Sequence, residues 1–239
     1  MRFYRQLQPF KIISFDLDDT LYDNHAVIME AETQFLAVLQ RLALPHLPAE
    51  LLKERWREVK SAVALADPLL SEDVVRWRIT ALEWLLRQSA VSADKIEPII
   101  TQVMAHFVHW RHQISVPSQS LEILNYLAQR YPLAAITNGN VDPQKIGLDH
   151  FSLCLRGGEH GRAKPHFDLF EQTARYFNVR SEQILHIGDN LQTDVQGAIQ
   201  AGCQAVWLNL TDDHLHSNPQ SRNLPTLELT DLSQLLRLA

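Results

Sequence analysis

Cysteine is scarce in this sequence: Cys154 and Cys203 are the only two among 239 residues. Cys154 lies in an apolar run, and Cys203 follows a glycine. Small secreted domains that depend on disulfides are far richer in cysteine. We therefore predict two reduced, buried thiols that pack as small apolar side chains.

Long apolar runs and dense clusters of positive charge are also missing. The first apolar stretch, residues 12–15, follows several basic residues but stops at Asp16, so it is too short for a secretory signal or a membrane span. Lys and Arg number 22 against 28 Asp and Glu, for a net charge of −6. Such a surface repels a polyanion weakly. These absences predict a soluble, cytoplasmic protein with no membrane or nucleic-acid partner.

Hydrophobic residues make up 46% of the chain and occur in short runs. Such runs are typical of strands buried on both faces of a parallel sheet. The predicted strands cover residues 12–15, 133–136, 153–155, 184–187 and 205–208. Predicted helices lie between them, at residues 118–130, 167–177 and about 193–201, the last capped by Thr193 or Asp194. The alternation predicts a three-layer, Rossmann-like α/β core with right-handed crossovers.

Residues 24–113 interrupt this alternation. The interval contains no convincing strand, and its pattern predicts helices at residues 25–42, 48–65, 72–89 and 93–112. A helical insert between the first two strands of a sheet is typical of a separate cap domain. We therefore predict an α/β core of residues 1–22 and 114–239 and an all-helical cap of residues 23–113.

Polar residues follow several of the predicted strands. The strand-end residues are Asp16, Asp18 and Thr20, then Thr137 and Asn138, then Gly188 and Asp189. Asp194 comes five residues after Asp189, and Lys164 precedes a predicted helix. Ligands of open α/β sheets bind at the carboxyl ends of the strands, so these side chains should converge on one crevice. Asp19 and Thr20 could equally hold the turn, and Asp194 could be only a helix N-cap.

The chemistry of these residue types points to phosphoryl transfer. Several carboxylates in one crevice repel one another and do not all ionise without a cation. Oxygen ligands suit Mg²⁺, and Mn²⁺ or Co²⁺ could substitute for it. A carboxyl group turned away from the ion, such as Asp18, could carry a proton near neutral pH. Lys164 and the Thr137 hydroxyl would neutralise and hydrogen-bond the phosphoryl oxygens of a small phosphorylated metabolite.

The spacing of the aspartates is specific. Asp-x-Asp-x-Thr together with Gly-Asp-x-x-x-x-Asp is expected by chance in roughly 0.002–0.003 of chains of this length. The segments that carry the resemblance are Phe15–Tyr22, Thr137–Gly139, Lys164-Pro165, and Gly188-Asp189 with Asp194. Through them the chain resembles the haloacid-dehalogenase superfamily over nearly its whole length. The resemblance implies a magnesium-dependent phosphatase with a helical cap.

The resemblance also implies a role for each residue. Asp16 would be the nucleophile and a metal ligand, and Asp18 the acid/base, which binds the metal through its backbone carbonyl. Asp189 would be a further metal ligand, and Asp194 would lie outside the direct ligands and pair with Lys164. The residues at the substrate phosphate would be Thr137, Asn138 and Lys164.

Some segments resemble one group within the superfamily more closely. They are Met1–Arg5, Asp16–Asn24, Ile136–Asn140 and His160–Arg162. They resemble phosphatases that act on flavin mononucleotide and on 5-amino-6-(5-phospho-D-ribitylamino)uracil, which belongs to riboflavin biosynthesis. The resemblance implies a substrate of that kind.

Three other functions share parts of the pattern. A 2-haloacid dehalogenase has the same fold and an aspartate nucleophile, but it needs neither a metal nor a second acid. A phosphomutase would use every catalytic residue named above, and only its products would differ. A non-catalytic regulator that binds a phosphorylated metabolite would not need the intact pair Asp16 and Asp18. A monomer is compatible with the sequence.

Overall fold

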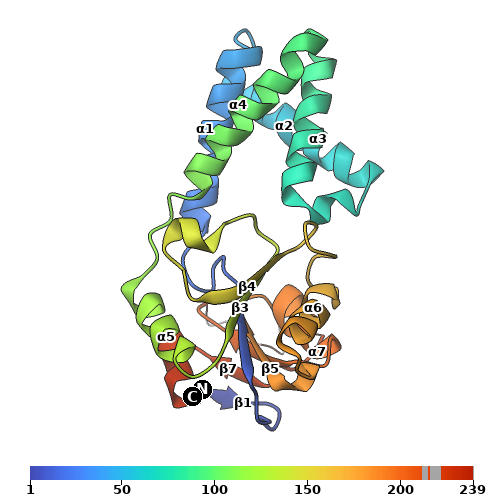
Figure 1. The fold of residues 1–239 in the computed structure, drawn as a ribbon. Coiled ribbons are helices and arrows are strands. Elements are labelled where there is room, and N and C mark those ends of the chain that lie inside the picture. The colour runs from blue at the N-terminus through green and yellow to red at the C-terminus, as the bar shows by residue number, and fades with distance from the viewer. Residues whose placement is uncertain (212–214, 216–221, 239) are drawn as a thin grey trace. The chain divides into compact units, whose positions relative to one another are not determined.

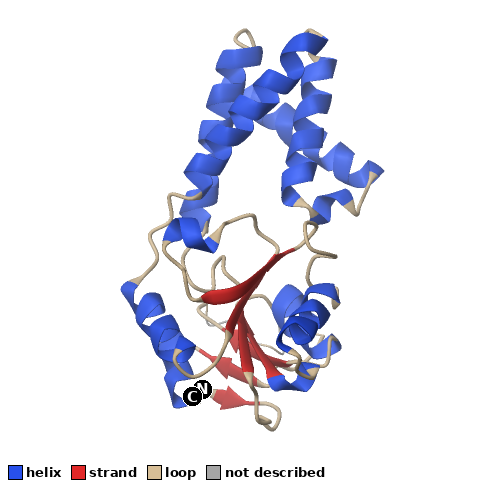
Figure 2. Cartoon of the chain, viewed as in Figure 1, coloured by secondary structure: helices blue, strands red, loops and turns tan. Residues whose placement is uncertain are grey.

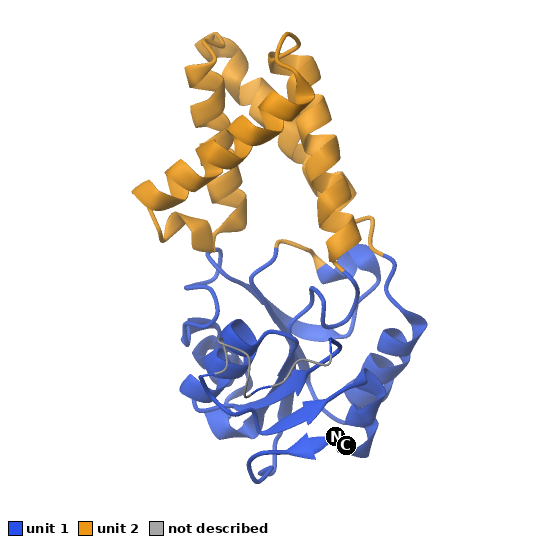
Figure 3. Cartoon of the chain, turned by 180° about the vertical axis from the view of Figure 1, so that it is seen from behind, with its two compact units in different colours: residues 1–23, 115–139, 143–239 blue, residues 24–114, 140–142 orange. Residues whose placement is uncertain are grey.

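The structure, a computed structural model, describes residues 1–211, 215 and 222–238. The chain divides into two compact units, which Figure 3 shows in different colours. One unit consists of residues 1–23, 115–139 and 143–239, and the other of residues 24–114 and 140–142. The first unit contains the sheet, and the second is helical.

In the described part of the first unit, seven strands form one sheet (Figure 2). Their order is β1-β7-β6-β5-β2-β3-β4, and every neighbouring pair is parallel except β1 with β7. The strands are β1 Arg2–Phe3, β2 Ile12–Phe15, β3 Leu133–Thr137, β4 Phe151–Arg156, β5 Ile184–Gly188, β6 Gln204–Leu208 and β7 Leu227–Leu229. β2, β3, β5 and β6 are buried along their whole length. Burial on both faces explains their nearly continuous apolar sequences.

Helices cover both faces of this sheet (Figure 1). α5 (Ser118–Ala128) and the 3₁₀ helix Leu232–Arg237 lie on one face. α6 (Asp168–Phe177) and the short α7 (Gly197–Gln200) lie on the other, and α6 packs on β3 and β4. This arrangement confirms the predicted three-layer α/β core.

Two strands of the sheet were not predicted, β1 and β7. They have two and three residues, which is too short for a periodic pattern to stand out. They pair antiparallel, with Arg2 opposite Glu228. The Tyr4 hydroxyl donates to Glu228 Oε2 at 2.6 Å and adds a side-chain link between the same two segments.

The second unit, residues 24–114 and 140–142, is described throughout and contains four α-helices. They are α1 His25–Ala43, α2 Ala49–Ala66, α3 Val74–Gln88 and α4 Ala93–Arg111, with a 3₁₀ helix at Leu70–Glu72. These helices lie where the sequence pattern predicts them, and they pack around buried side chains such as Phe35, Trp56 and Leu82. Among the described residues, no helix is both long enough and apolar enough to cross a membrane.

Two details of the sequence prediction were wrong. The helix expected at about residue 193 begins earlier, as a π-helical segment, Leu191–Gln196, that runs into α7. Its N-cap is Asn190, whose side chain accepts hydrogen bonds from the backbone N–H groups of Gln192 and Thr193. Cys154 is partly exposed on the edge strand β4, whereas Cys203 is buried as predicted.

Candidate active site

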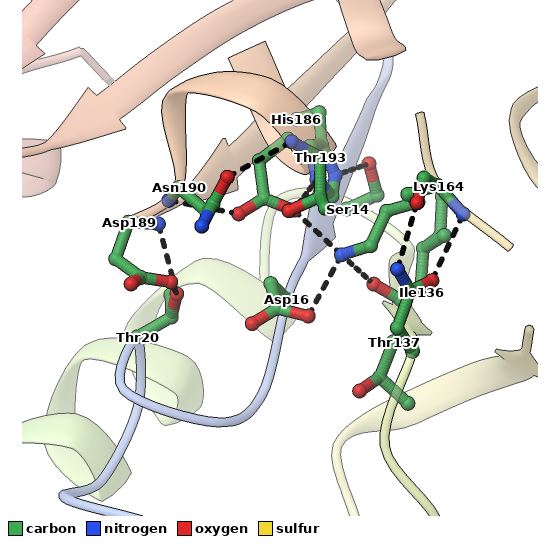
Figure 4. Close-up of polar contacts among 12 residues, drawn as sticks. Ser14, Asp16, Thr20, Ile136, Thr137, Lys164, His186, Asp189, Asn190 and Thr193 are labelled. Carbon is green, nitrogen blue, oxygen red and sulfur yellow. Dashed lines mark hydrogen bonds and ion pairs between the residues drawn. The ribbon is translucent and has the colours of Figure 1, made fainter. Parts of the chain in front are cut away.

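The carboxyl edge of the sheet brings together the polar residues that follow β2, β3 and β5 (Figure 4). Asp16 directly follows β2, Thr137 ends β3, and Asp189 directly follows β5. β2 lies between β3 and β5 in the sheet, so Asp16 occupies the centre of the group. The convergence predicted from strand order is therefore present in the structure.

Lys164 links Asp16, Asp194 and the backbone of β3 through its ammonium group. Nζ donates to Asp16 Oδ1 at 2.7 Å, to Asp194 Oδ1 at 2.6 Å and to the Ile136 carbonyl oxygen at 2.6 Å. Burial alone would lower the pKa of Lys164, but the two carboxylates outweigh burial and raise it. The side chain is therefore a charged, buried cation. The predicted pairing of Asp194 with Lys164 is confirmed.

Asp194 lies against the backbone at Gly188. A Cβ atom at position 188 would overlap the Asp194 carboxylate, so only glycine allows this approach. Asp194 Oδ2 accepts from the Asn190 backbone N–H at 3.0 Å. Burial would raise the pKa of Asp194, but Lys164 and a hydrogen bond from His186 lower it to about 2. Asp194 is therefore an anion inside the π-helical segment, and it is not the N-cap of that segment.

The carboxylates form one cluster that is suited to a cation. Among the described residues, oxygen atoms of Asp16, Asp189 and Asp194 lie within 4.8 Å of one another. Burial raises the pKa of Asp16 well above its usual value despite Lys164, and Asp194 adds to the rise. Burial, followed by the charge of Asp194, raises the pKa of Asp189 to about 6. Three carboxylates beside one ammonium leave negative charge uncompensated, and an all-oxygen donor set of this kind fits Mg²⁺.

Asp18 has different surroundings from Asp16. Its Oδ1 accepts from the Tyr22 hydroxyl at 2.7 Å. Its Oδ2 lies only 2.5 Å from where a Cβ would stand on Gly139, so the Gly139 backbone closely approaches this carboxyl group. The side chain of Asp18 is thus directed toward the loop after β3, while Asp16 is directed toward Lys164.

Thr137 and Asn138 occupy that loop and make different contacts. The Thr137 hydroxyl oxygen accepts from the Gly139 N–H at 2.9 Å, so its own O–H is still a donor. The Asn138 side chain makes two hydrogen bonds to the Lys164 backbone, accepting from its N–H at 2.9 Å and donating to its carbonyl at 2.8 Å. Asn138 therefore holds the loop that carries Lys164 against the end of β3.

The sequence analysis did not predict a role for Ser14 and His186, and it assigned Thr20 no definite role. Thr20, interpreted as a possible turn residue, exchanges hydrogen bonds with Asp189: its hydroxyl donates to Oδ1 and accepts from the backbone N–H, each at 3.2 Å. Ser14 and His186 lie inside the strands and hydrogen-bond to each other at 2.9 Å. The available signal was a single polar residue within each apolar run, Ile12–Phe15 and Ile184–Ile187.

Comparison with known proteins agrees with this geometry. The model of one family, "Hydrolase: haloacid dehalogenase-like hydrolase", matches residues 10–202. The chain belongs to this family. The match includes Asp16, Asp18, Lys164, Asp189 and Asp194, so the family assignment covers the whole carboxyl edge described above.

Individual relatives extend the similarity to the full length of this haloacid dehalogenase-like hydrolase. The chain is 41% identical over 241 residues to the 5-amino-6-(5-phospho-D-ribitylamino)uracil phosphatase YigB of Escherichia coli K12, with 100% of both chains covered. It is 43% identical to a phosphoserine phosphatase of Thermus thermophilus over 83 residues, 32% of this chain and 33% of that one. The crystal structure of a 2-haloacid dehalogenase from Pseudomonas syringae pv. Tomato DC3000 matches with a TM-score of 0.86 and 30% identity, covering 96% of this chain and 97% of that one. Family and relatives support an enzyme with phosphatase activity.

Proposed function

We propose that this enzyme hydrolyses a small phosphate monoester through an aspartyl-phosphate on Asp16, with Mg²⁺ as cofactor. The observation that carries the proposal is the separation of Asp16 from Asp18. Asp16 belongs to the carboxylate cluster and is bonded to Lys164, whereas Asp18 is bonded to Tyr22. Two carboxyl groups in different environments are suited to two roles, nucleophile and proton donor.

The reaction proceeds in two in-line steps. An Asp16 carboxylate oxygen attacks phosphorus while the bond to the leaving oxygen breaks, and Asp18 gives that oxygen its proton. Asp18, now a carboxylate, then removes a proton from a water molecule that attacks the aspartyl-phosphate. This second displacement releases inorganic phosphate, regenerates the Asp16 carboxylate and returns the proton to Asp18.

The other residues act on charge and orientation. Lys164 would neutralise the phosphoryl oxygens through its charge, since its three N–H groups donate to protein oxygen atoms. The O–H of Thr137 would donate to a phosphoryl oxygen, and Asn138 would contribute its backbone N–H because its side chain is bonded to the Lys164 backbone. Asp16, Asp189 and the Asp18 backbone carbonyl would hold Mg²⁺. The ion would supply positive charge that keeps Asp16 ionised and screens it from the substrate. Asp194 would act through Lys164.

The dehalogenase alternative is less well supported by this site. A structure of a 2-haloacid dehalogenase is among the most similar ones, at 30% identity. However, displacement of halide from carbon needs no proton donor and no cation, whereas this chain places Asp18 beside the reacting edge and crowds three carboxylates together. The full-length relative at 41% identity is a phosphatase. A phosphomutase would differ only in its products.

Replacing Asp18 by asparagine should slow the hydrolysis of alkyl phosphates more than that of 4-nitrophenyl phosphate. The variant cannot give a proton, so its kcat on an alkyl phosphate should fall by about 10²–10⁴-fold. The rate of the first step should fall less on 4-nitrophenyl phosphate, since nitrophenolate leaves without a proton. Release of the leaving alcohol in a single turnover tests this expectation, because the second step is the same for both esters. Equal slowing of that release on the two esters would mean that Asp18 is not the proton donor of the first step.

The substrate we propose is flavin mononucleotide or 5-amino-6-(5-phospho-D-ribitylamino)uracil. The support is the full-length relative from Escherichia coli together with the sequence segments that resemble such phosphatases. kcat/KM should be higher for these two compounds than for phosphoglycolate or hexose phosphates, with Mg²⁺ present throughout. A higher value for phosphoglycolate or a hexose phosphate would contradict the substrate and leave the phosphatase proposal intact.

A further inference from the structure

Two polar side chains lie completely buried in the middle of the sheet. Ser14 on β2 and His186 on β5 are 0% exposed and stand opposite each other in the parallel register of these strands. Their strand neighbours are apolar. A buried polar group destabilises the fold unless it is hydrogen-bonded, so this pair calls for a physical reason.

The reason is a continuous series of hydrogen bonds that reaches the proposed nucleophile (Figure 4). Ser14 Oγ lies 2.9 Å from His186 Nδ1, and His186 Nε2 lies 3.3 Å from Asp194 Oδ1. The same Asp194 oxygen accepts from Lys164 Nζ at 2.6 Å, and Lys164 Nζ donates to Asp16 Oδ1 at 2.7 Å. The series therefore runs from the interior of the sheet to its reacting edge.

The direction of each bond follows from the chemistry of its members. Asp194 is an anion that only accepts, so His186 Nε2 must carry a hydrogen. Burial lowers the pKa of His186 and keeps the ring neutral, so Nδ1 has no hydrogen and accepts from the Ser14 hydroxyl. Phe170 packs edge-on against the imidazole, with 5.0 Å between ring centroids, and restricts the ring plane. Asp194 thereby sets the tautomer of His186, and the Ser14 hydroxyl holds the ring in place by donating to the bare Nδ1.

We propose that Ser14 and His186 are positioning residues that hold Asp194 and Lys164 in line with Asp16. The inference rests on the proposed role of Asp16 as nucleophile. Asp194 Oδ1 is oriented by two donors, Lys164 and His186. Oδ2 is held by the Asn190 N–H, so without the N–H of His186 the carboxylate would turn about that bond and Oδ1 would move. The lysine would follow Oδ1, and Asp16 would lose its alignment with the phosphorus atom. Misalignment affects the chemical step more than substrate binding.

The test compares Ser14→Ala with a matched control, Thr173→Val. Thr173 on α6 is equally buried and donates its hydroxyl to the Leu169 carbonyl at 2.8 Å, so each variant loses one buried hydrogen bond. With 4-nitrophenyl phosphate and Mg²⁺, Ser14→Ala should lower kcat about tenfold with KM nearly unchanged, while Thr173→Val keeps the wild-type kcat. Equal kcat values for the two variants would overturn the proposal.

Variants of His186 provide a second measurement. His186→Gln keeps an N–H donor at the end of the side chain and should retain most of the activity that His186→Leu loses. Adding Ser14→Ala to His186→Leu should cause little further loss, because Ser14 acts through the imidazole. Losses that multiply would contradict the proposal. If His186→Leu fails to fold, the Ser14→Ala comparison decides the question alone.

A spectroscopic measurement separates this inference from the function of the site. The imidazole ¹⁵N shifts of His186 in the wild-type protein should report hydrogen on Nε2 and a bare Nδ1. Ser14→Ala should leave the hydrogen on Nε2 and shift the Nδ1 resonance, because the bare nitrogen loses the hydrogen bond from the Ser14 hydroxyl. The opposite tautomer in the wild type would overturn the positioning role whether or not the protein is a phosphatase. A wild-type protein without phosphatase activity but with the expected tautomer would contradict the proposed function alone.

Discussion

Asp16→Asn should lower kcat for phosphate monoesters by at least about 10⁴-fold, because an amide oxygen cannot form the aspartyl-phosphate. The fold should be retained, since the two side chains are nearly isosteric. Burial raises the pKa of Asp16 well above its usual value, so its charged form gains little from the folded environment. Lys164 also keeps Asp194 as a charged partner in the variant. Steady-state rates and thermal melting of the purified variant measure both expectations.

Asp231→Asn is a suitable control for this variant. Asp231 is exposed in the same unit, and its carboxylate accepts from the Ser233 backbone N–H at the start of a 3₁₀ helix. Asparagine caps such a turn equally well, so activity and melting temperature should remain at wild-type values. If Asp16→Asn retained activity within about tenfold of the wild type, Asp16 would not be the nucleophile.

Removal of divalent cations should abolish turnover, and Mg²⁺ should restore it, with Mn²⁺ or Co²⁺ substituting in part. The physical reason is the cluster of Asp16, Asp189 and Asp194, in which Lys164 forms ion pairs with Asp16 and Asp194. Asp189→Asn should raise the Mg²⁺ concentration needed for half-maximal activity. Titration of a chelator-treated enzyme with each ion tests this. Full activity in excess chelator would favour the metal-independent dehalogenase chemistry instead.

The same titration should depend on pH in a defined direction. Burial and Asp194 raise the pKa of Asp189 to about 6, so this carboxyl group takes up a proton as the pH falls through that value. A protonated carboxyl group does not ligate Mg²⁺, and the ion must then compete with the proton. The apparent affinity for Mg²⁺ should therefore be constant well above pH 6 and weaken below it.

The α/β core and most of the site follow from short-range features of the sequence. Apolar runs define β2, β3 and β5, and a parallel sheet places whatever follows them, such as Asp16 and Asp189, at one edge. The pairing of β1 with β7 could not be predicted from the sequence, because it depends on contacts between residues more than two hundred positions apart. The N-cap of the helix after β5 was also predicted wrongly, as Thr193 or Asp194 in place of Asn190. Asn and Asp are equally good N-cap residues, and the tertiary contact of Asp194 with Lys164 is not visible in the sequence.

The roles of Ser14 and His186 could not be predicted for a related reason. A single polar residue in a buried strand has no preferred partner in the sequence, since its partner is set by the register of the next strand. Here the register places Ser14 opposite His186, and the segment after β5 brings Asp194 Oδ1 within 3.3 Å of His186 Nε2. The sequence shows that a buried polar group exists, and only the folded sheet shows what it contacts.

The three hydrogen bonds of Lys164 also limit what this amine can do chemically. An amine attacks a carbonyl or an acyl donor only with a lone pair, which exists only after a proton is lost. Lys164 directs its three N–H bonds at three oxygen atoms, and two adjacent carboxylates raise its pKa. Acylating reagents and aldehydes should therefore react with exposed lysines such as Lys53 and Lys95, while Lys164 should contribute charge without nucleophilic reactivity.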